Sequence, residues 1–119
     1  MSQASPIDAA TLANLLDATG GDQAFVDELV DTYLAEGERL ISNLVAAAQA
    51  DAIPDLVLPA HSLKSSSLNL GALELGELCR ALEADARNGS VPDPAERAAA
   101  IAAAFAEARE ALLEERARR

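Results

Sequence analysis

The chain has 119 residues, enough for one compact domain and too few for two, and it carries a formal charge of −11. So acidic a protein is not expected to bind nucleic acid or an anionic membrane, because such binding relies on basic patches. A single cysteine, Cys79, excludes an internal disulfide and a cysteine-rich zinc site, and it fits a reducing compartment. The N-terminus lacks a signal-peptide pattern, and the longest apolar run, residues 98–106, is about half the length of a membrane span. We therefore expect a soluble, cytoplasmic protein.

The apolar half of the sequence is dominated by residues that favour helices. It contains 28 Ala and 18 Leu but only three aromatic residues, and few of its apolar residues are β-branched. Ala and Leu are strong helix formers, whereas strands are usually rich in β-branched and aromatic side chains. Leu, Val and Ala also recur three and four positions apart, which is the spacing of one helix face. We therefore predict an all-α fold in the form of a helical bundle.

Two helices are expected in the first fifty residues. Asp8 is a suitable N-cap for a short helix, which the two glycines at 20–21 end. Asp22 can cap a second, long helix that runs to about Ala50, with apolar residues at helical spacing along it. Gly37 lies in the middle of this second helix, where a glycine is expected to weaken it.

Two further helices are expected on either side of the glycine at position 71. The third is predicted from about residue 54 to residue 68 or 70. Pro59 inside it should kink or delay its first turns, because proline lacks a backbone donor. The fourth is predicted from about residue 72 to residue 88. Its apolar stripe is predicted to consist of Leu75, Leu78, Cys79, Leu82 and Ala86.

The last helix is predicted to begin at a capping box. The order Asp93-Pro94-Ala95-Glu96 places a capping carboxylate before a proline at the first helical position, and an apolar stripe with Ile101 and Phe105 follows. Short connections between amphipathic helices favour antiparallel neighbours. We therefore predict an antiparallel up-down four-helix bundle with a short extra N-terminal helix. Residues 1–119 are expected to form a single domain, with residues 1–6 flexible.

The only histidine of the chain, His61, lies on the predicted third helix. A lone histidine is usually a solvated surface residue or a core residue with one bonded nitrogen. On a helix, however, His61 shares a face with Lys64 and Ser65, three and four positions further on. Neutral imidazole is a nucleophile, an ammonium group offsets the charge of a phosphate, and a small side chain lets a partner approach closely. These three residues together suit a phosphoryl group carried on a ring nitrogen.

The geometry of a hairpin adds candidates from the fourth helix. If the helices on either side of the central glycine run antiparallel, His61 lies level with Leu82 or Glu83. Because Leu82 belongs to the apolar stripe, Glu83 is the polar candidate, and Arg87 follows one turn later on the same face. A carboxylate that accepts the Nδ1 proton would fix the tautomer and leave Nε2 free to attack. The plainer alternative is an exposed Glu–Arg pair at i and i+4, worth roughly a few tenths of a kcal/mol.

Residues 60–83 read AHSLKSSSLNLGALELGELCRALE. This run resembles the signature of histidine phosphotransfer (HPt) domains, four-helix bundles that relay phosphoryl groups between receiver-domain aspartates. By this resemblance His61 is similar to the phosphorylated histidine, and Lys64 is similar to the residue beside the phosphate. Glu83 is similar to the polar residue that orients the imidazole. One position departs from the pattern, because many members have glycine where this chain has Ser65.

The resemblance implies a phosphorelay intermediate rather than an enzyme. The chain has no glycine-rich phosphate loop and no kinase-type ATP site, so its phosphoryl donor must be another protein. The expected partners are receiver domains of response regulators or of hybrid histidine kinases, and the receiver supplies the Mg²⁺ ion for the transfer. No cofactor or metal is expected on this chain, because one histidine cannot supply the two Glu-x-x-His motifs of a di-iron bundle. Lys64 and Arg87 are expected to face the acidic receiver pocket, beside an apolar docking patch on the first and third helices.

Two other functions stay open from the sequence. A non-catalytic helical adaptor would bind a partner through an apolar helix face, and His61 would then be incidental. The other is the dimerisation and phosphoacceptor region of a sensor kinase, which fits less well because no ATP-binding domain follows and the helix order differs from that of a two-helix dimer. We therefore expect a monomer that carries a phosphoryl group on His61.

Overall fold

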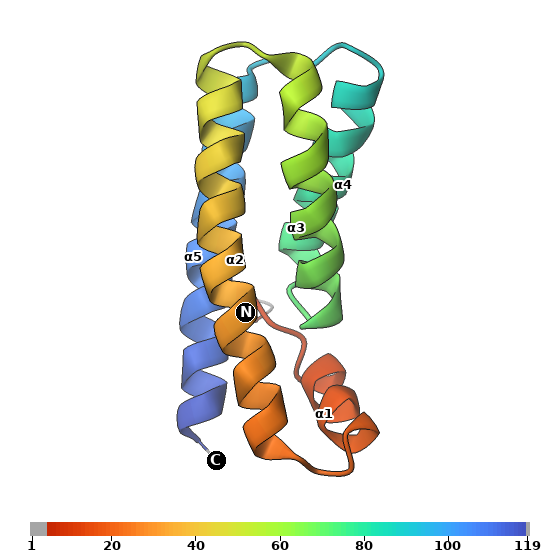
Figure 1. Ribbon diagram of the computed structural model, residues 1–119, viewed down its shortest axis with the longest axis vertical. Helices are drawn as coiled ribbons and strands as arrows, with labels where there is room; N and C mark the ends of the chain where they lie inside the picture. The colour runs from red at the N-terminus through yellow and green to blue at the C-terminus, as the bar shows by residue number, and fades with distance from the viewer. Residues whose placement is uncertain (1–4, 119) are drawn as a thin grey trace, which may run out of the picture.

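The computed structural model describes residues 5–118 and contains only helices in that part of the chain. In order these are α1 (Ala9–Ala18), α2 (Gln23–Gln49), the short 3₁₀ helix η1 (Ile53–Leu56), α3 (Val57–Asn69), α4 (Leu73–Arg87) and α5 (Pro94–Ala117). Helices α2 to α5 run alternately up and down as a four-helix bundle, in which α2 lies beside α5 and α3 lies beside α4 (Figure 1). The predicted all-α, up-down four-helix bundle with a short extra N-terminal helix is confirmed.

Helix α1 covers one end of the bundle. The helices α2 and α5 have 27 and 24 residues, whereas α3 and α4 have 13 and 15, so the longer pair extends beyond the α3–α4 turn. Figure 1 shows α1 below that turn, beside the N-terminal part of α2. Ile7 and Leu12 are buried there and join the core. The short helix thus shields apolar surface that the unequal helix lengths would otherwise expose.

Side-chain caps fix the starts of α1 and α2 at the predicted residues. The Asp8 carboxylate accepts the Thr11 backbone N–H at 3.2 Å, and the Asp22 carboxylate accepts the Phe25 N–H at 3.1 Å. The two glycines at 20–21 have positive φ angles and separate the helices. The predicted bounds of both helices are therefore confirmed.

Pro59 lies in the first turn of α3, whose start it delays as predicted. Residues 53–56 first form η1, and the α-helix begins only at Val57. Backbone N–H groups in a first turn have no partner inside the helix, so the missing donor costs little at this position. The helix then continues to Asn69.

The predicted capping box at the start of α5 is wrong. Pro94 is the first residue of α5, as expected, but the Asp93 side chain makes no capping hydrogen bond. Asp93 has a φ of 48° and a ψ of 58°, in the left-handed region, whereas a capping side chain reaches the first turn from an extended backbone. The start of α5 is tied to α4 instead by an ion pair of 2.6 Å between Arg97 Nη1 and Asp85 Oδ2.

The core is filled by aliphatic side chains from η1 and from every helix of the bundle. Its largest fully buried aliphatic side chains are Leu44, Leu56, Leu63, Leu75, Leu82, Ile101 and Leu112. The rings of Tyr33 and Phe105 pack among them with centroids 5.7 Å apart. Cys79 is also buried, and burial raises the pKa of its thiol to about 12, which makes it a poor nucleophile. The interpretation of Cys79 as a small core residue is confirmed.

The buried face of α4 is rotated from the predicted one. Leu78, predicted to belong to the apolar stripe, is 36% exposed, whereas Gly76 and Glu83 are buried. Successive residues of a helix are turned by about 100°, so the buried residues of α4 form an arc centred on Cys79 when viewed along the helix axis. Gly76 and Glu83 lie on one side of this arc, and Leu78 lies outside the arc on the opposite side. Since Gly76 packs against Leu68 of α3, the flank that holds Glu83 is the one that faces α3.

Two expectations from the sequence, the flexibility of the N-terminus and the single-domain organisation, stay predictions. The expected flexibility of residues 1–6 falls mainly on residues 1–4, which lie outside the described residues. That residues 1–119 form a single domain also stays a prediction. Among the described helices, none is long and apolar enough to cross a membrane.

Gly37 of α2 has a packing role that the sequence did not reveal. It is buried, and a Cβ atom built there would overlap the ring of Phe105 of α5. The ring has little room to move, because Phe105 is itself buried and packs against Tyr33. The absence of a side chain at Gly37 therefore lets α2 and α5 approach each other closely.

Overpacking against Phe105 is expected to cost about 1–3 kcal/mol in the variant Gly37→Ala, and the gain in helix propensity offsets about 1 kcal/mol of this cost. The variant should therefore be destabilised by up to about 2 kcal/mol. Urea unfolding followed by circular dichroism measures the difference. As a control, the double variant Gly37→Ala with Phe105→Leu should lose less stability than the sum of the two single changes. A Gly37→Ala protein more stable than the wild type would contradict this account of the packing.

Candidate functional site

A tight hairpin at Gly71 brings α3 and α4 side by side. Gly71 has a φ of 87°, in the left-handed region that favours glycine, and its carbonyl accepts the backbone N–H of Asp8 at 2.8 Å. A Cβ atom at this position would lie 2.9 Å from the Asp8 carbonyl oxygen, so only glycine fits without strain. The turn therefore sets the register between α3 and α4 and ties the start of α1 to the hairpin.

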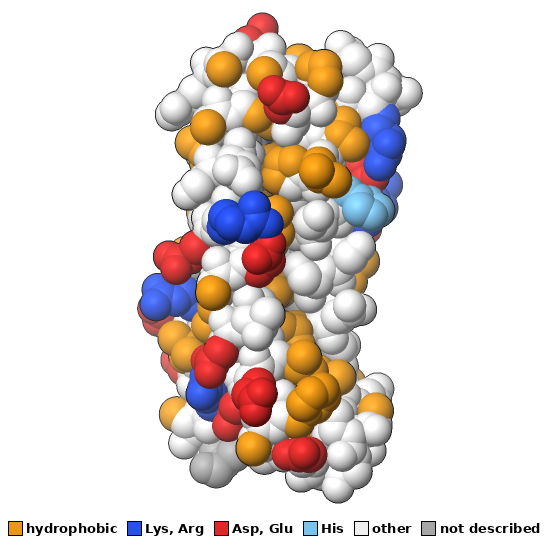
Figure 2. Space-filling model, in the orientation of Figure 1, with side chains coloured by type: hydrophobic (Ala, Val, Ile, Leu, Met, Phe, Trp, Pro, Cys, Tyr) orange, Lys and Arg blue, Asp and Glu red, His pale blue; other side chains and the backbone are white. Residues whose placement is uncertain are grey.

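The hairpin places His61 of α3 beside Glu83 of α4. The Nδ1 atom of His61 lies 3.1 Å from Oε2 of Glu83. The imidazole side chain is 48% exposed, whereas the Glu83 side chain is only 9% exposed. Figure 2 shows the single imidazole at the surface, next to basic side chains and an acidic one. An exposed ring is thus held on one side by a nearly buried carboxylate.

Two cations bond the same carboxylate. The Nζ atom of Lys64 lies 2.8 Å from Oε1 of Glu83. The Nε and Nη2 atoms of Arg87 lie 2.9 and 2.8 Å from Oε2, the oxygen that also contacts His61. Lys64 follows His61 by one turn on α3, and Arg87 follows Glu83 by one turn on α4. The structure therefore brings four of the five predicted site residues into one cluster.

The contacts of Glu83 keep its carboxyl group ionised. The hydrogen bond from Lys64 has the largest effect on the pKa of Glu83, and burial acts in the opposite direction. Together with the hydrogen bonds from Arg87 and His61, the Lys64 bond outweighs burial and lowers this pKa to about 2. An ionised carboxylate only accepts hydrogen bonds, so the proton between the two groups lies on Nδ1 of His61. In the neutral ring this leaves Nε2 unprotonated.

The fifth predicted residue, Ser65, lies beside His61 but outside the cluster. It is exposed on the same face of α3, one turn after the histidine. Its neighbour Ser67 is instead buried, and the Ser67 hydroxyl lies 2.8 Å from the Tyr33 hydroxyl of α2. Burial raises the pKa of Tyr33 to about 12, so this bond joins two neutral hydroxyls. The bond fixes the rotation of α3 against α2, and with it the direction in which His61 faces.

An exposed leucine beside His61 was missed in the sequence. Leu58 lies one turn before His61 on α3 and is 73% exposed, more than any other large apolar side chain in the described part of the chain. Leu68, seven positions after His61, is partly exposed and packs against Gly76. Because Leu58 lies three positions before His61, the sequence places both residues on one helix face. An apolar residue at such a spacing is, however, equally typical of a buried stripe, so the sequence alone does not show that Leu58 is exposed. The exposed face of α3 that carries His61 therefore has an apolar side chain on each side of the histidine, Leu58 before it and Leu68 after it.

A groove of about 380 Å³ lies between α1, α2 and α3. Its lining is mainly apolar and includes Leu15 of α1, Leu29 of α2 and Leu70, which directly follows α3. Residues 66 and 69 of α3, five and eight positions after the histidine, also line it. An apolar surface therefore occurs where the first and third helices meet, as the sequence predicted for docking.

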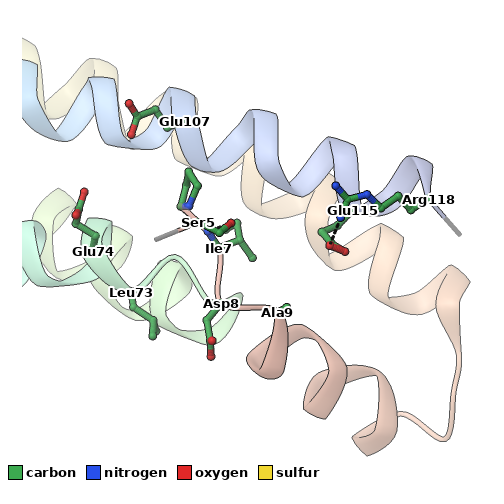
Figure 3. Close-up of a pocket in the computed structure, with 11 residues that line it drawn as sticks. Ser5, Ile7, Asp8, Ala9, Leu73, Glu74, Glu107, Glu115 and Arg118 are labelled. Atoms are coloured by element: carbon green, nitrogen blue, oxygen red, sulfur yellow. Dashed lines mark hydrogen bonds and ion pairs between the residues drawn. The ribbon is translucent and has the colours of Figure 1, made fainter. Parts of the chain in front are cut away.

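A second hollow, of about 650 Å³, is formed by the N-terminal segment, the start of α4 and the end of α5 (Figure 3). Its charged lining is acidic apart from Arg118, whose Nη1 lies 3.1 Å from Oε2 of Glu115. None of the predicted site residues lines it. Within residues 5–118, no group of three or more His, Cys, Asp and Glu side chains gathers to hold a metal ion.

The arrangement is shared with known proteins. A family model described as Hpt domain matches residues 28–111, which is more than two thirds of the chain. Among solved structures, the chain is similar to histidine-containing phosphotransfer protein B (HptB) from Pseudomonas aeruginosa PAO1. The two have 31% sequence identity and a TM-score of 0.87, over 98% of this chain and 99% of that one. No match was found among curated proteins. Because the family match spans the whole α3–α4 hairpin and most of the bundle, the protein belongs to the Hpt domain family.

Proposed function

We propose that His61 is the residue on which this phosphorelay intermediate carries its phosphoryl group. The observation that carries the proposal is the bond between an exposed imidazole and a nearly buried, ionised carboxylate. That bond occupies Nδ1 and, in the neutral ring, leaves Nε2 unprotonated, which is the state a nucleophile needs. Membership of the Hpt domain family supports the same role.

In the forward step the Nε2 lone pair attacks the phosphorus atom of an aspartyl phosphate on a receiver domain. The Nε2–P bond forms as the P–O bond to the aspartate breaks, and the freed carboxylate stays with the receiver. A Mg²⁺ ion held by the receiver balances the charge of the moving group, so this chain is proposed to need no metal or nucleotide of its own. The protein is a phosphoryl carrier rather than an enzyme with a nucleotide site.

The contact with Glu83 also suits the onward step to a second receiver. Once Nε2 bears phosphorus, a ring that keeps its Nδ1 proton is positively charged and can leave as neutral imidazole. The negative charge of Glu83 stabilises that proton. One carboxylate therefore serves both directions of transfer, which suits a reversible carrier.

The other predicted site residues suit the phosphoryl group and its partner. Lys64, one turn after His61, supplies a positive charge beside the ring to offset a phosphoryl group. Ser65 presents a small side chain where the receiver approaches, with a hydroxyl that can bond a phosphoryl oxygen. Arg87 adds an exposed cation to face an acidic receiver pocket.

The surface around His61 suits a receiver domain as the partner. A stable interface covers about 800 Å² on each protein, so it extends well beyond one helical turn from the reacting nitrogen. Leu58 lies within that distance, and the groove with Leu15 and Leu29 borders the same face of α3. An apolar centre with charges around it is typical of such contacts. We propose receivers of response regulators or hybrid histidine kinases as partners of a cytoplasmic monomer that binds neither nucleic acid nor membrane.

Incubation with a phosphorylated receiver should place an acid-labile, alkali-stable label on the protein, as expected of a P–N bond on His61. The variant His61→Gln, which removes the nucleophile, should take no label, and its circular dichroism spectrum should match that of the wild type. Label that persists on His61→Gln would contradict the assignment. A receiver that binds both proteins equally and transfers nothing would favour the adaptor function instead.

The variant Leu58→Ala should slow transfer from a receiver about three- to tenfold, because a docked receiver buries this exposed side chain. Rates are measured with receiver concentrations below saturation. Leu113→Ala on α5, which also removes a partly exposed leucine, is the matched control and should transfer at the wild-type rate. Equal rates for both variants would remove Leu58 from the docking surface.

The variant Glu83→Gln should be less stable than the wild type at neutral pH, with a difference that shrinks in acid. Glu83 has a folded pKa of about 2, below its ordinary 4.5, so its stabilisation is complete above about pH 5 and is lost as the pH falls toward 2. Urea unfolding at pH 7, 5 and 3 measures the effect. Glu77→Gln is the control on the same helix, and its smaller effect is expected because Glu77 and Arg80 are both exposed. A stability difference that does not depend on pH would be inconsistent with an ionised Glu83.

A further inference from the structure

Glu83 divides its contacts between its two oxygen atoms. Lys64 bonds Oε1 at 2.8 Å. The Nδ1 atom of His61 and both bonding nitrogens of Arg87 lie at Oε2. The bond to Lys64 can therefore break without disturbing the oxygen that orients the imidazole.

The two cations also differ in their attachment. Lys64 stands on α3, three residues after His61, and its ammonium is a compact charge on a flexible stem. Arg87 stands on α4, four residues after Glu83, and its planar guanidinium bonds Oε2 through two nitrogens. Lys64 thus shares a helix with the nitrogen that receives the phosphoryl group, whereas Arg87 shares a helix with the carboxylate.

Phosphorylation changes the charge balance of this cluster. In the free protein two cations face one carboxylate, so positive charge is in excess. A phosphoryl group brings roughly two negative charges and competes with Glu83 for those cations. Glu83 is only 9% exposed and cannot lose both partners without leaving a buried charge unpaired. One cation is free to move, and one has to remain.

We propose, on the basis that His61 is the phosphoacceptor, that Lys64 leaves Glu83 for the phosphoryl oxygens while Arg87 remains on Glu83. Arg87 is then a positioning residue, which keeps the carboxylate ionised and bonded to Nδ1 while Lys64 is away. The exchange forms and breaks no covalent bond. It gives Arg87 a role beyond that of an exposed Glu–Arg pair on one helix.

The same helix offers a matched arginine as a control. Arg80 lies seven residues before Arg87 on α4, and the two side chains are 57% and 58% exposed. Arg80 pairs with Glu77, which is exposed and is not part of the cluster. A change seen when Arg87 is replaced, but not when Arg80 is replaced, is therefore specific to Arg87. It is not a general effect of removing an exposed arginine from α4.

The full chain can be phosphorylated without a receiver by phosphoramidate, whose P–N bond to ammonia breaks as the Nε2–P bond forms and ammonia leaves. Nitrogen NMR then follows the Lys64 ammonium and the Arg87 guanidinium before and after the reaction. The Lys64 signal is expected to shift, whereas the Arg87 Nε signal stays in place. An unmoved Lys64 signal, or an Arg87 signal that shifts instead, overturns the inference.

The positioning role is tested by the Nδ1 proton of phosphorylated His61. In Arg87→Gln this proton should exchange with water at least about tenfold faster. With Lys64 on the phosphoryl group and Arg87 removed, no cation keeps Glu83 ionised and bonded to Nδ1. Arg80→Gln should behave like the wild type, and Arg87→Lys should restore part of the protection. Equal exchange in Arg87→Gln and the wild type overturns the role of Arg87. A chain that takes no label on His61 from phosphoramidate or from a receiver overturns the proposed function itself, an outcome distinct from these.

Discussion

The contact between the His61 imidazole on α3 and the Glu83 carboxylate on α4 is the interaction on which the other features of the site depend. It joins an exposed ring to a nearly buried charge, and such a charge needs cations close by. Lys64 supplies one from α3 and Arg87 supplies the other from α4. The cations keep the carboxylate ionised, and the ionised carboxylate holds the ring proton on Nδ1. The reactivity of one exposed nitrogen thus depends on charges that lie between two helices.

The bundle contributes by fixing how these two helices meet. The left-handed backbone of Gly71 closes the hairpin tightly and sets the register that places residue 61 level with residue 83. The buried bond between Tyr33 and Ser67 sets the rotation of α3 about its own axis. Register and rotation are both required, because a shift of one residue turns a helical side chain by about 100°. Helix α1, tied to the Gly71 turn through a backbone hydrogen bond, completes the apolar surface beside the site.

Much of this arrangement follows from local sequence patterns. Caps, glycines and helical periodicity predict the helices, and counting residues on either side of the hairpin predicts that Glu83 lies beside His61. The features that the sequence did not predict depend on backbone conformation and on which groups surround a side chain in the folded protein. Asp93 has the residue type of a cap but a left-handed backbone, which residue type does not reveal. Leu58 has the residue type of a core position but lies on the exposed face of α3 that carries His61. The division of the Glu83 oxygens between two cations depends on side-chain positions and has no sequence signal.

The position of the ring proton in the free protein tests this account most directly. Nitrogen NMR distinguishes the two neutral tautomers of His61 at neutral pH by the chemical shifts of Nδ1 and Nε2. We expect a protonated Nδ1 and an unprotonated Nε2 in the wild type, with a shift toward the other tautomer in Glu83→Ala. A proton on Nε2 in the wild type, or a tautomer balance unchanged in Glu83→Ala, would contradict it.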